Sequence, residues 1–377
     1  MKDLLNLVLK RQGRPRVLGL KIERRYVYFA ALVSLVTLLV LFQLPVTNSV
    51  DAPRRTMVSA GKTMKEATEA LREYRDRSDL TIDRTIDPNL TGLIGRERTE
   101  LTTTLGDLEA KRTTTNPNFA GLMVLLMKEV GVSRGESVAI GASASFPGAI
   151  IATLSAVKAI GADPLIIYSL GSSMWGANLK DLTILDMHRV LGQRDIIPFG
   201  VNAASLGGED DIGGSMDKET RSGLMGKIEK SGAKLIRSPS LRDSVKERME
   251  LYNRGSGGKV EAFVNIGGAA ANMGSSARIL QLEPGINLIK DLPPEEKRGV
   301  IYEMASKDVP VIHILNVKGL ALKYQLPWDP VPLPDPGEDA IFDERENKPL
   351  LFWLVFVGYF GVLAPGLVAL YRTREEG

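Results

Sequence analysis

The chain has 377 residues, a formal net charge of +3 at pH 7 and 44% hydrophobic residues. That length is ample for a globular domain with its own core. The chain has no cysteine, which excludes disulfides and thiolate metal sites, so a domain outside the cytoplasm would be held by its core alone.

A long apolar segment stands near the start of the sequence. No charged residue occurs between Arg25 and Asp51, and the segment reads YVYFAALVSLVTLLVLFQL. About 20 apolar residues in a helix cross a bilayer, so we predict a transmembrane helix over residues 26–45. A cleaved signal peptide is the alternative, but its apolar region would be shorter and would end in a small-x-small site. The sequence PVTNSVDAP offers no such site, which favours an uncleaved anchor.

Residues 46–116 are predicted to join this helix to a domain. Apolar residues at three- and four-residue spacing predict an amphipathic stalk helix that ends near Arg77, with a helix that packs on the membrane surface as the alternative. The stretch from Ile86 to Pro117 is rich in Thr, Gly and charge. We interpret it as an ordered lead-in with little regular structure, with a flexible linker as the alternative.

An alternation of strands and helices fills residues 117–325. Strands are predicted in SVAIGA, PLIIYSL, IIPFG, AKLIRS, VEAFVNIGG and VPVIHILN, with amphipathic helices between them. Strands separated by helices need crossover connections. The pattern therefore predicts an α/β domain with a mainly parallel, Rossmann-like sheet and helices on both faces.

A proline-rich return segment and a second apolar segment follow the domain. Residues 326–348 contain LPWDPVPLPDP, which predicts an extended strap. No charge occurs between Lys348 and Arg372, so we predict a second transmembrane helix over residues 349–371.

Basic residues next to the two predicted spans set the expected orientation. They gather in residues 1–25 and recur in residues 372–377. Cations in short flanks stay in the cytoplasm, so we expect a two-pass protein of the plasma membrane with both termini inside and the domain outside. The domain is slightly acidic, so the basic excess favours contact with membrane lipids over nucleic acid.

The strongest chemical signal is the turn GASASFPGA, which follows the first predicted strand of the domain. Ligands of open α/β sheets bind at the carboxyl ends of strands, beside helix N-termini that favour anions. We therefore predict that Ser143, Ser145 and Phe146 bind a ligand. In a hydrolase elbow, Ser143 or Ser145 would be the nucleophile and His188 or His313 the base, although the final glycine of G-x-S-x-G is missing. Serines that cap the helix and histidines that are structural are the other interpretation.

Two further loops, SLGSSMWGAN and NIGGAAANMGSS, also follow predicted strands. Neither carries G-x-G-x-x-G or a P-loop, so nucleotide binding is disfavoured and no cofactor is predicted. The acidic loop GGEDDIGGSMD has oxygen ligands for a hard cation, but it lacks EF-hand spacing and fits a solvated loop, so no metal is predicted. The ligand-binding candidates in the first two loops are Ser172, Ser173, Trp175, Asn178, Asn265, Gly267 and Gly268.

Several of these motifs together resemble a known family. The segment TGLIGRERTELTTTLGDLEAKRTTTNPNFAG, the turn SFPG, SSMWGAN with LDMH, and VNIGGAAANMG resemble the family of poly-gamma-glutamate system proteins, over about Asp87 to Asn316. These membrane proteins accompany the synthesis and export machinery of poly-γ-glutamate. The family has no settled catalytic residues, so none is carried over.

The resemblance implies an anionic polymer as ligand and the membrane subunits of a poly-γ-glutamate synthase or exporter as partners. The cations expected to contact its carboxylates are Arg96, Arg98, Lys111 and Arg112. A non-catalytic accessory subunit is the leading hypothesis, and a homo-oligomer is compatible with it. A membrane-anchored serine hydrolase or transferase that acts on the γ-glutamyl polymer is the alternative.

Overall fold

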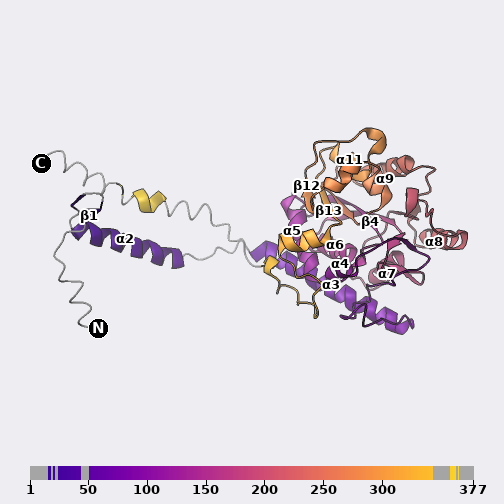
Figure 1. The fold of residues 1–377 in the computed structure, drawn as a ribbon, viewed down its shortest axis with the longest axis horizontal. Helices are drawn as coiled ribbons and strands as arrows, with labels where there is room; N and C mark the ends of the chain where they lie inside the picture. Colours follow the sequence, from indigo (N-terminus) through magenta and orange to yellow (C-terminus); the bar gives the residue numbers. More distant parts are fainter. Residues whose placement is uncertain are drawn as a thin grey trace. The chain divides into compact units, whose positions relative to one another are not determined.

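The computed structural model shows a chain that divides into two compact units (Figure 1). The terminal unit comprises Met1–Val50 with Glu344–Gly377, and the central unit comprises Asp51–Asp343. The structure describes residues 16–17, 20–21, 24–43, 51–342, 357–361 and 364.

In the terminal unit, two short strands and one helix are described. Strands β1 (Arg16–Val17) and β2 (Leu20–Lys21) pair antiparallel. Helix α2 (Arg24–Gln43) follows, over the first predicted span. Ser34 of α2 lies 2.8 Å from the hydroxyl of Tyr359, so the two predicted spans share a side-chain hydrogen bond.

The predicted membrane spans are described only in part. Most of residues 349–371, and the tail residues 1–15 and 372–377, lie outside the described residues. Among the helices that the structure describes, none combines the length and apolar character needed to cross a membrane.

The central unit is built on a seven-stranded sheet with the order β10-β9-β5-β4-β11-β13-β12. Its pairings are parallel except that of the edge strand β12 with β13. This confirms the predicted α/β class with a mainly parallel sheet. The strands are β4 (Ser137–Ser143), β5 (Asp163–Ser169), β9 (Ala203–Ser205), β10 (Lys234–Leu235), β11 (Ala262–Ile266), β12 (Gly285–Asn287) and β13 (Val311–Ile314).

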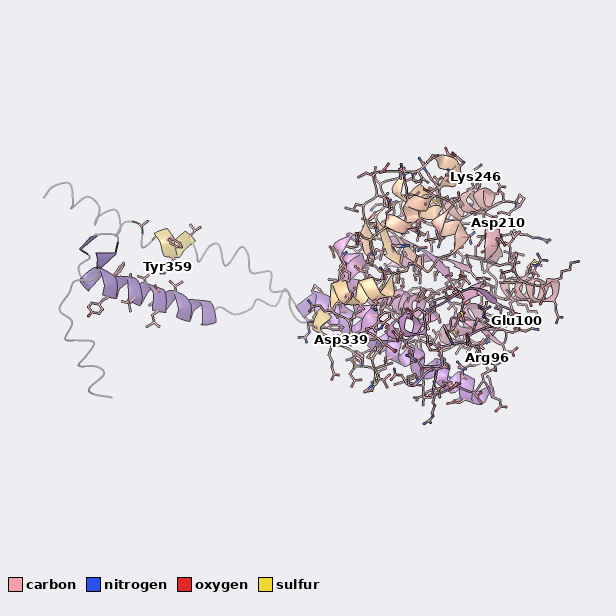
Figure 2. All side chains as sticks on the ribbon, viewed as in Figure 1. Arg96, Glu100, Asp210, Lys246, Asp339 and Tyr359 are labelled. Atoms are coloured by element: carbon pink, nitrogen blue, oxygen red, sulfur yellow. The ribbon has the colours of Figure 1, made fainter. Side chains whose placement is uncertain are left out.

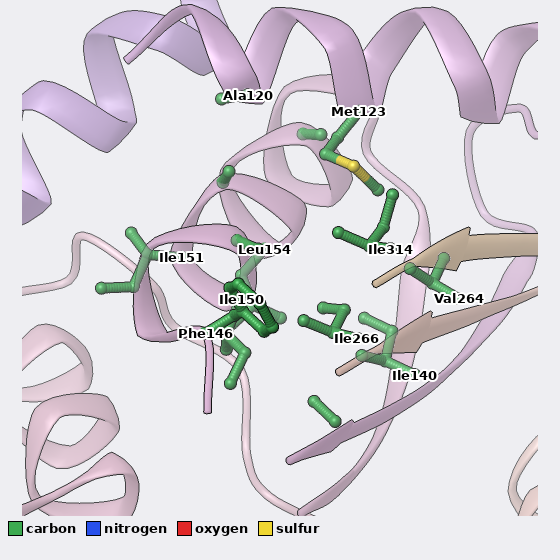
Figure 3. Packing of buried hydrophobic residues seen from close by; sticks show 14 of the residues in the cluster. Ala120, Met123, Ile140, Phe146, Ile150, Ile151, Leu154, Val264, Ile266 and Ile314 are labelled. Atoms are coloured by element: carbon green, nitrogen blue, oxygen red, sulfur yellow. The ribbon is translucent and has the colours of Figure 1, made fainter. Parts of the chain in front are cut away.

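One face of the sheet packs against a large apolar core. Ile150 of α6 packs on Ile140 and Ile266 of the sheet (Figure 3). Pro147 opens α6 at a position that needs no N–H, and Gly161 ends it in the left-handed conformation, with φ of 76°. The helices of this face are α3 (Asp51–Arg77), α5 (Asn118–Glu129), α6 (Pro147–Ile160), α7 (Ile184–Gln193) and α8 (Lys218–Lys230).

A second, smaller core lies on the opposite face. Tyr252 packs edge-on against Phe263 of β11, with ring centroids 5.9 Å apart, and donates a hydrogen bond to the carbonyl of Ile140. In Figure 1, α9 and α11 lie on the side of the strands away from α3 and α7. The helices of this face are α9 (Leu241–Gly255), α10 (Ala270–Met273) and α11 (Val300–Ala305).

The predicted stalk and lead-in belong to the central unit. Helix α3 ends at Arg77 as predicted, but it packs on α5 and α6 and its apolar side is buried in the main core. The lead-in forms β3 (Thr102–Thr104), which pairs with β6 (Ser172–Ser173), and helix α4 (Leu108–Thr113). The guanidinium of buried Arg75 donates hydrogen bonds to the carbonyls of Leu80, Thr81, Gly92 and Ile94.

The proline-rich strap is tied to the lead-in. Arg112 pairs with Asp329 through its guanidinium, and the Trp328 indole donates a 2.8 Å hydrogen bond to Glu109. The segment predicted as an extended return strap therefore packs against the domain. Other short elements are β7 (Asn178–Leu179), β8 (Leu182–Thr183), α12 (Val317–Tyr324) and the 3-10 turns Glu209–Asp211, Ala277–Gln281, Glu295–Lys297 and Ala340–Phe342.

The predicted strand IIPFG, residues 196–200, is wrong. Pro198 has no N–H for a ladder, and the strand forms later, as β9. Asn202 directly precedes β9, and its side chain accepts a 2.6 Å hydrogen bond from the backbone N–H of Ile166 in β5.

Candidate functional site

The candidate site lies where the strand order of the sheet reverses. From β4 the chain builds outward through β5 and β9 on one side, and later through β11 and β13 on the other. In doubly wound sheets, ligands bind outside the carboxyl ends of the strands at this reversal. The turn after β4 and the glycines Gly267 and Gly268 after β11 both lie there.

Ser143 ends β4 beside the reversal point. Its side chain is 4% exposed, and its Oγ is one of the few buried polar side-chain atoms of the described residues without a hydrogen-bond partner. A Cβ on Gly267 would lie 2.3 Å from this Oγ, so only glycine leaves room for the hydroxyl. Buried hydroxyls are normally paired, which marks Ser143 as a group that a ligand can satisfy.

The N-terminus of α6 lies directly after Ser143. Its cap residue, Phe146, supplies no side-chain hydrogen bond to the helix, whereas α7, α8 and α9 are each capped by a side chain. The helix has 14 residues, long enough to give its N-terminus a partial positive charge and free N–H groups. The local field therefore favours an anion.

A buried lysine stands beside this helix end. Lys111 of α4 is 2% exposed, and its Nζ donates a 2.7 Å hydrogen bond to Ser173 Oγ. The ammonium also lies 3.4 Å from the ring centroid of Phe146. The backbone N–H of Ser173 donates in turn to Ser145 Oγ at 3.0 Å. We call Lys111, Ser145, Phe146 and Ser173 the lysine–serine cluster.

The pKa of Lys111 lies near neutral pH. Burial lowers the pKa of Lys111 to about 7, and the nearby Asp107 carboxylate opposes this only in part. At neutral pH the amine is therefore present both as a cation, which can pair with a carboxylate, and as a neutral base.

The two histidines do not complete a serine dyad. His188 is held between the Tyr168 hydroxyl, 3.0 Å from Nδ1, and the Phe199 carbonyl, 2.7 Å from Nε2. His313 Nδ1 lies 3.0 Å from the Asn265 amide, and burial lowers its pKa to about 4. Neither histidine is hydrogen-bonded to Ser143 or Ser145, so the predicted Ser–His pair is not formed.

Three of the predicted ligand residues have structural roles. Asn178 is fully buried. Its side-chain amide accepts a hydrogen bond from the backbone N–H of Arg96 and donates one to the carbonyl of the same residue. Ser172 Oγ donates to the carbonyls of Ala144 and Ser173. Arg112 is ion-paired with Asp329 of the strap.

The remaining predicted residues range from buried to exposed, and Asn265 is fully buried. Trp175 is half-buried with a φ of 58°, and its backbone N–H donates to the Arg96 carbonyl. Asn265 Nδ2 donates to the Gly267 carbonyl, so it shapes the glycine turn. The side chains of Arg96 and Arg98 are exposed, and Figure 2 labels Arg96 on the lead-in.

A buried ionic network along the same sheet edge was not predicted. Arg248 of α9 pairs with Asp211 at 2.8 Å, with both side chains 1% exposed. Serines at the ends of adjacent strands bind this pair: Ser169 and Ser205 each donate to Asp211 Oδ1. The sequence signal that could have predicted this network is the serine at the end of each strand. Ser143, Ser169 and Ser205 stand in register across β4, β5 and β9.

The network also occupies one carboxylate of the acidic loop. Asp211 is turned inward to Arg248 and is not free to bind a cation. Within the described residues, no group of three or more His, Asp or Glu side chains is placed to hold a metal ion.

Comparison of the chain with family models, curated proteins and solved structures finds no match. A buried lysine, an unpaired hydroxyl and an uncapped helix N-terminus together suit a carboxylate.

Proposed function

We propose that this chain is a membrane-anchored accessory subunit of a poly-γ-glutamate synthesis or export system, and that its α/β domain binds carboxylates of the polymer. The observation that carries the proposal is the unpaired Oγ of Ser143 at the uncapped N-terminus of α6, next to Lys111. The motifs that resemble the poly-gamma-glutamate system family support the choice of polymer.

The two ends of the central unit lie close together, which is compatible with the proposed anchor of two apolar segments. A Cβ on Gly121 would meet the ring of Phe342 at 2.7 Å and Met57 at 3.5 Å, so the two ends of the central unit lie together. Ser34 and Tyr359 are hydrogen-bonded within the terminal unit. A two-span anchor would bring the domain to lipids and to the membrane subunits of the synthase or exporter.

Equilibrium binding tests the carboxylate site. The full chain in detergent is titrated with a fluorescent oligomer of γ-linked glutamate, alongside the variants Ser143→Ala and Lys111→Met. Hydrogen bonds to charged groups contribute about 1.5–3 kcal/mol, so each variant should weaken binding about tenfold or more. The matched control is Ser155→Ala, which removes another buried unpaired hydroxyl from the middle of α6. Equal affinity of wild type and both site variants would reject the proposed site.

Reconstitution tests the accessory role. A synthase preparation is assayed with and without this chain for polymer yield, polymer length and delivery across the membrane. The proposal expects the length or the delivery to change while the rate of chemistry stays similar. Identical results in all three readouts would reject an accessory function.

The lysine–serine cluster favours a second candidate, a hydrolase or transferase of γ-glutamyl amides. Neutral Lys111 would accept the proton of Ser173 Oγ as that oxygen attacks the amide carbonyl. The amide C–N bond then breaks, the proton passes to the leaving amine, and water or another amine releases the acyl group. This mechanism replaces the Ser143–histidine or Ser145–histidine pair expected from the sequence.

Polymer length separates the two functions. Purified chain is incubated with poly-γ-glutamate, and the size distribution is followed by size-exclusion chromatography. Cleavage that Ser173→Ala abolishes and Ser143→Ala retains would establish the enzyme. An unchanged size distribution with the wild-type chain would leave binding as the function.

A further inference from the structure

A groove outside the candidate site lies at the edge of the sheet, beyond the ends of β9 and β10. It has a volume of about 590 Å³, within the range of sites that hold small ligands. Its lining comes from the loop after β9, from the first turns of α8 and from the segment after β10. It lies at the carboxyl edge of the parallel strands, where ligands of such sheets bind.

Three cations line this groove: Lys218, Arg221 and Arg237. Lys218 and Arg237 are exposed and Arg221 is half-buried. No ion pair joins any of them to a carboxylate among the described residues, although Arg112, Arg242 and Arg248 are all paired. Their charges are therefore available to a ligand.

The carboxylates near the groove do not cancel these charges. Asp211 lines the groove, but its charge is balanced by Arg248, and it accepts hydrogen bonds from three serine hydroxyls. Asp217 caps α8 through the Thr220 N–H at 2.7 Å. The groove thus keeps a net positive charge on a slightly acidic domain.

The floor of the groove is apolar. Leu206, Met225, Leu235 and Ile236 contribute to its lining. Cations around an apolar floor match a chain that alternates carboxylates with aliphatic links, since methylene groups gain by burial. A phosphate chain, which has no aliphatic part, would leave this floor unused.

The groove and the candidate site share one edge of the sheet. The candidate site is at the end of β4, and the groove is at β9 and β10, with β5 between them. Neighbouring strands are about 4.8 Å apart, so roughly 15 Å separate β4 from β10. An oligomer of a few residues spans that distance.

We propose that the groove of Lys218, Arg221 and Arg237 is a second carboxylate-binding site, which together with the Ser143 site holds a linear polycarboxylate along the sheet edge. This inference rests on the proposed function, because it takes the ligand of the Ser143 site to be a polycarboxylate. Two linked sites bind a chain that reaches both more tightly than a chain that reaches one.

Length dependence of affinity is the test. The full chain in detergent is titrated with fluorescent γ-linked glutamate oligomers of two lengths, one too short and one long enough to reach both sites. The wild type should bind the long oligomer at least about tenfold more tightly than the short one. The variant with Lys218, Arg221 and Arg237 all changed to Gln should lose this difference and still bind the short oligomer.

A second triple variant controls for the loss of general charge. Lys128, Arg134 and Arg254 are exposed and, within the described residues, form no ion pair; changing all three to Gln removes the same charge away from the groove. This variant should keep the length dependence. Thermal unfolding of both variants checks that the fold is retained.

The outcomes separate the two proposals. Length dependence that survives in the groove variant overturns the second site and leaves the Ser143 site intact. Absence of binding by the wild type to either oligomer overturns both. If the groove variant loses affinity for inorganic polyphosphate as strongly as for the long oligomer, the groove binds polyanions in general and its assignment to carboxylates is overturned.

Discussion

Lys111 Nζ donates a 2.7 Å hydrogen bond to Ser173 Oγ across 62 residues of sequence. The contact exists because the lead-in folds back over the carboxyl edge of the sheet, where β3 pairs with β6. The ammonium has a hydroxyl and the Phe146 ring for neighbours, and among the described residues no carboxylate pairs with it. Its desolvation is thus poorly compensated, which explains its lowered pKa.

Lys111→Met should stabilise the chain more at low pH than at high pH. The unfolded lysine keeps its proton to a pH of about 10.4, whereas the folded one loses it near pH 7. Between these values the unfolded state binds more protons, so the stability of the wild type rises with pH. Below pH 7 the wild type carries the full penalty of a buried charge, and above pH 10 almost none. Urea unfolding of wild type and variant at pH 6, 8 and 10 measures this, and two parallel stability profiles would contradict it.

Gly267→Ala should be destabilising, and Ser143→Ala should relieve part of the loss. The new Cβ would lie 2.3 Å from Ser143 Oγ, and the backbone φ of 78° is unfavourable for alanine. Removing the hydroxyl relieves the clash but leaves the backbone cost of about 1 kcal/mol. A double-mutant cycle by urea unfolding isolates the coupling.

Gly268→Ala is the matched control for this cycle. A Cβ there would meet only Leu315, at 3.9 Å, so the change should be nearly neutral. Additive effects of Gly267→Ala and Ser143→Ala would show that the hydroxyl does not fill the space seen in the structure.

Arg248→Met should cost about 3–5 kcal/mol of stability, since it leaves the buried Asp211 carboxylate without its cation. The double variant Arg248→Met with Asp211→Asn should recover a large part of that loss, because it removes both charges, keeps acceptors for the serine hydroxyls and tolerates the backbone φ of 65° at this position. Arg254→Met, an exposed change on the same helix, should be close to neutral. A double variant no more stable than Arg248→Met would mean that the cost lies in packing and not in the unpaired charge.

The sequence predicted the central sheet because each strand carries its own apolar pattern. β4, β5, β11 and β13 lie within their predicted segments or within one residue of them. β12 has only three residues, Gly285–Asn287, and gives too short a pattern to be recognised. The lead-in was predicted to be ordered, but its strand β3, its helix α4 and their packing on the sheet were not predicted. Its order depends on distant partners, such as the Asn178 amide that holds Arg96, and no local pattern encodes them.

The residues of the candidate site were predicted from the sequence, but most of their contacts were not. Ser143, Ser145 and Phe146 were found from the strand–turn–helix pattern, which is local. Lys111 was predicted to contact carboxylates of a polymer. Its burial against Ser173 and Phe146 depends on how the lead-in folds over the sheet, which no local pattern encodes. The pairing of Arg248 with Asp211 joins positions 37 residues apart, and charges on an amphipathic helix are normally solvated.

Cysteine labelling in intact cells should place the central unit outside the membrane, as the two-span anchor requires. The chain has no cysteine of its own, so a single introduced cysteine is the only residue that the maleimide label can modify. Lys230→Cys lies at the exposed end of α8 and should react with a membrane-impermeant maleimide without permeabilisation. Lys10→Cys, in the predicted cytoplasmic tail, should react only after permeabilisation. If Lys230→Cys also needs permeabilisation, the domain is inside, and the proposed contact with exported polymer fails with it.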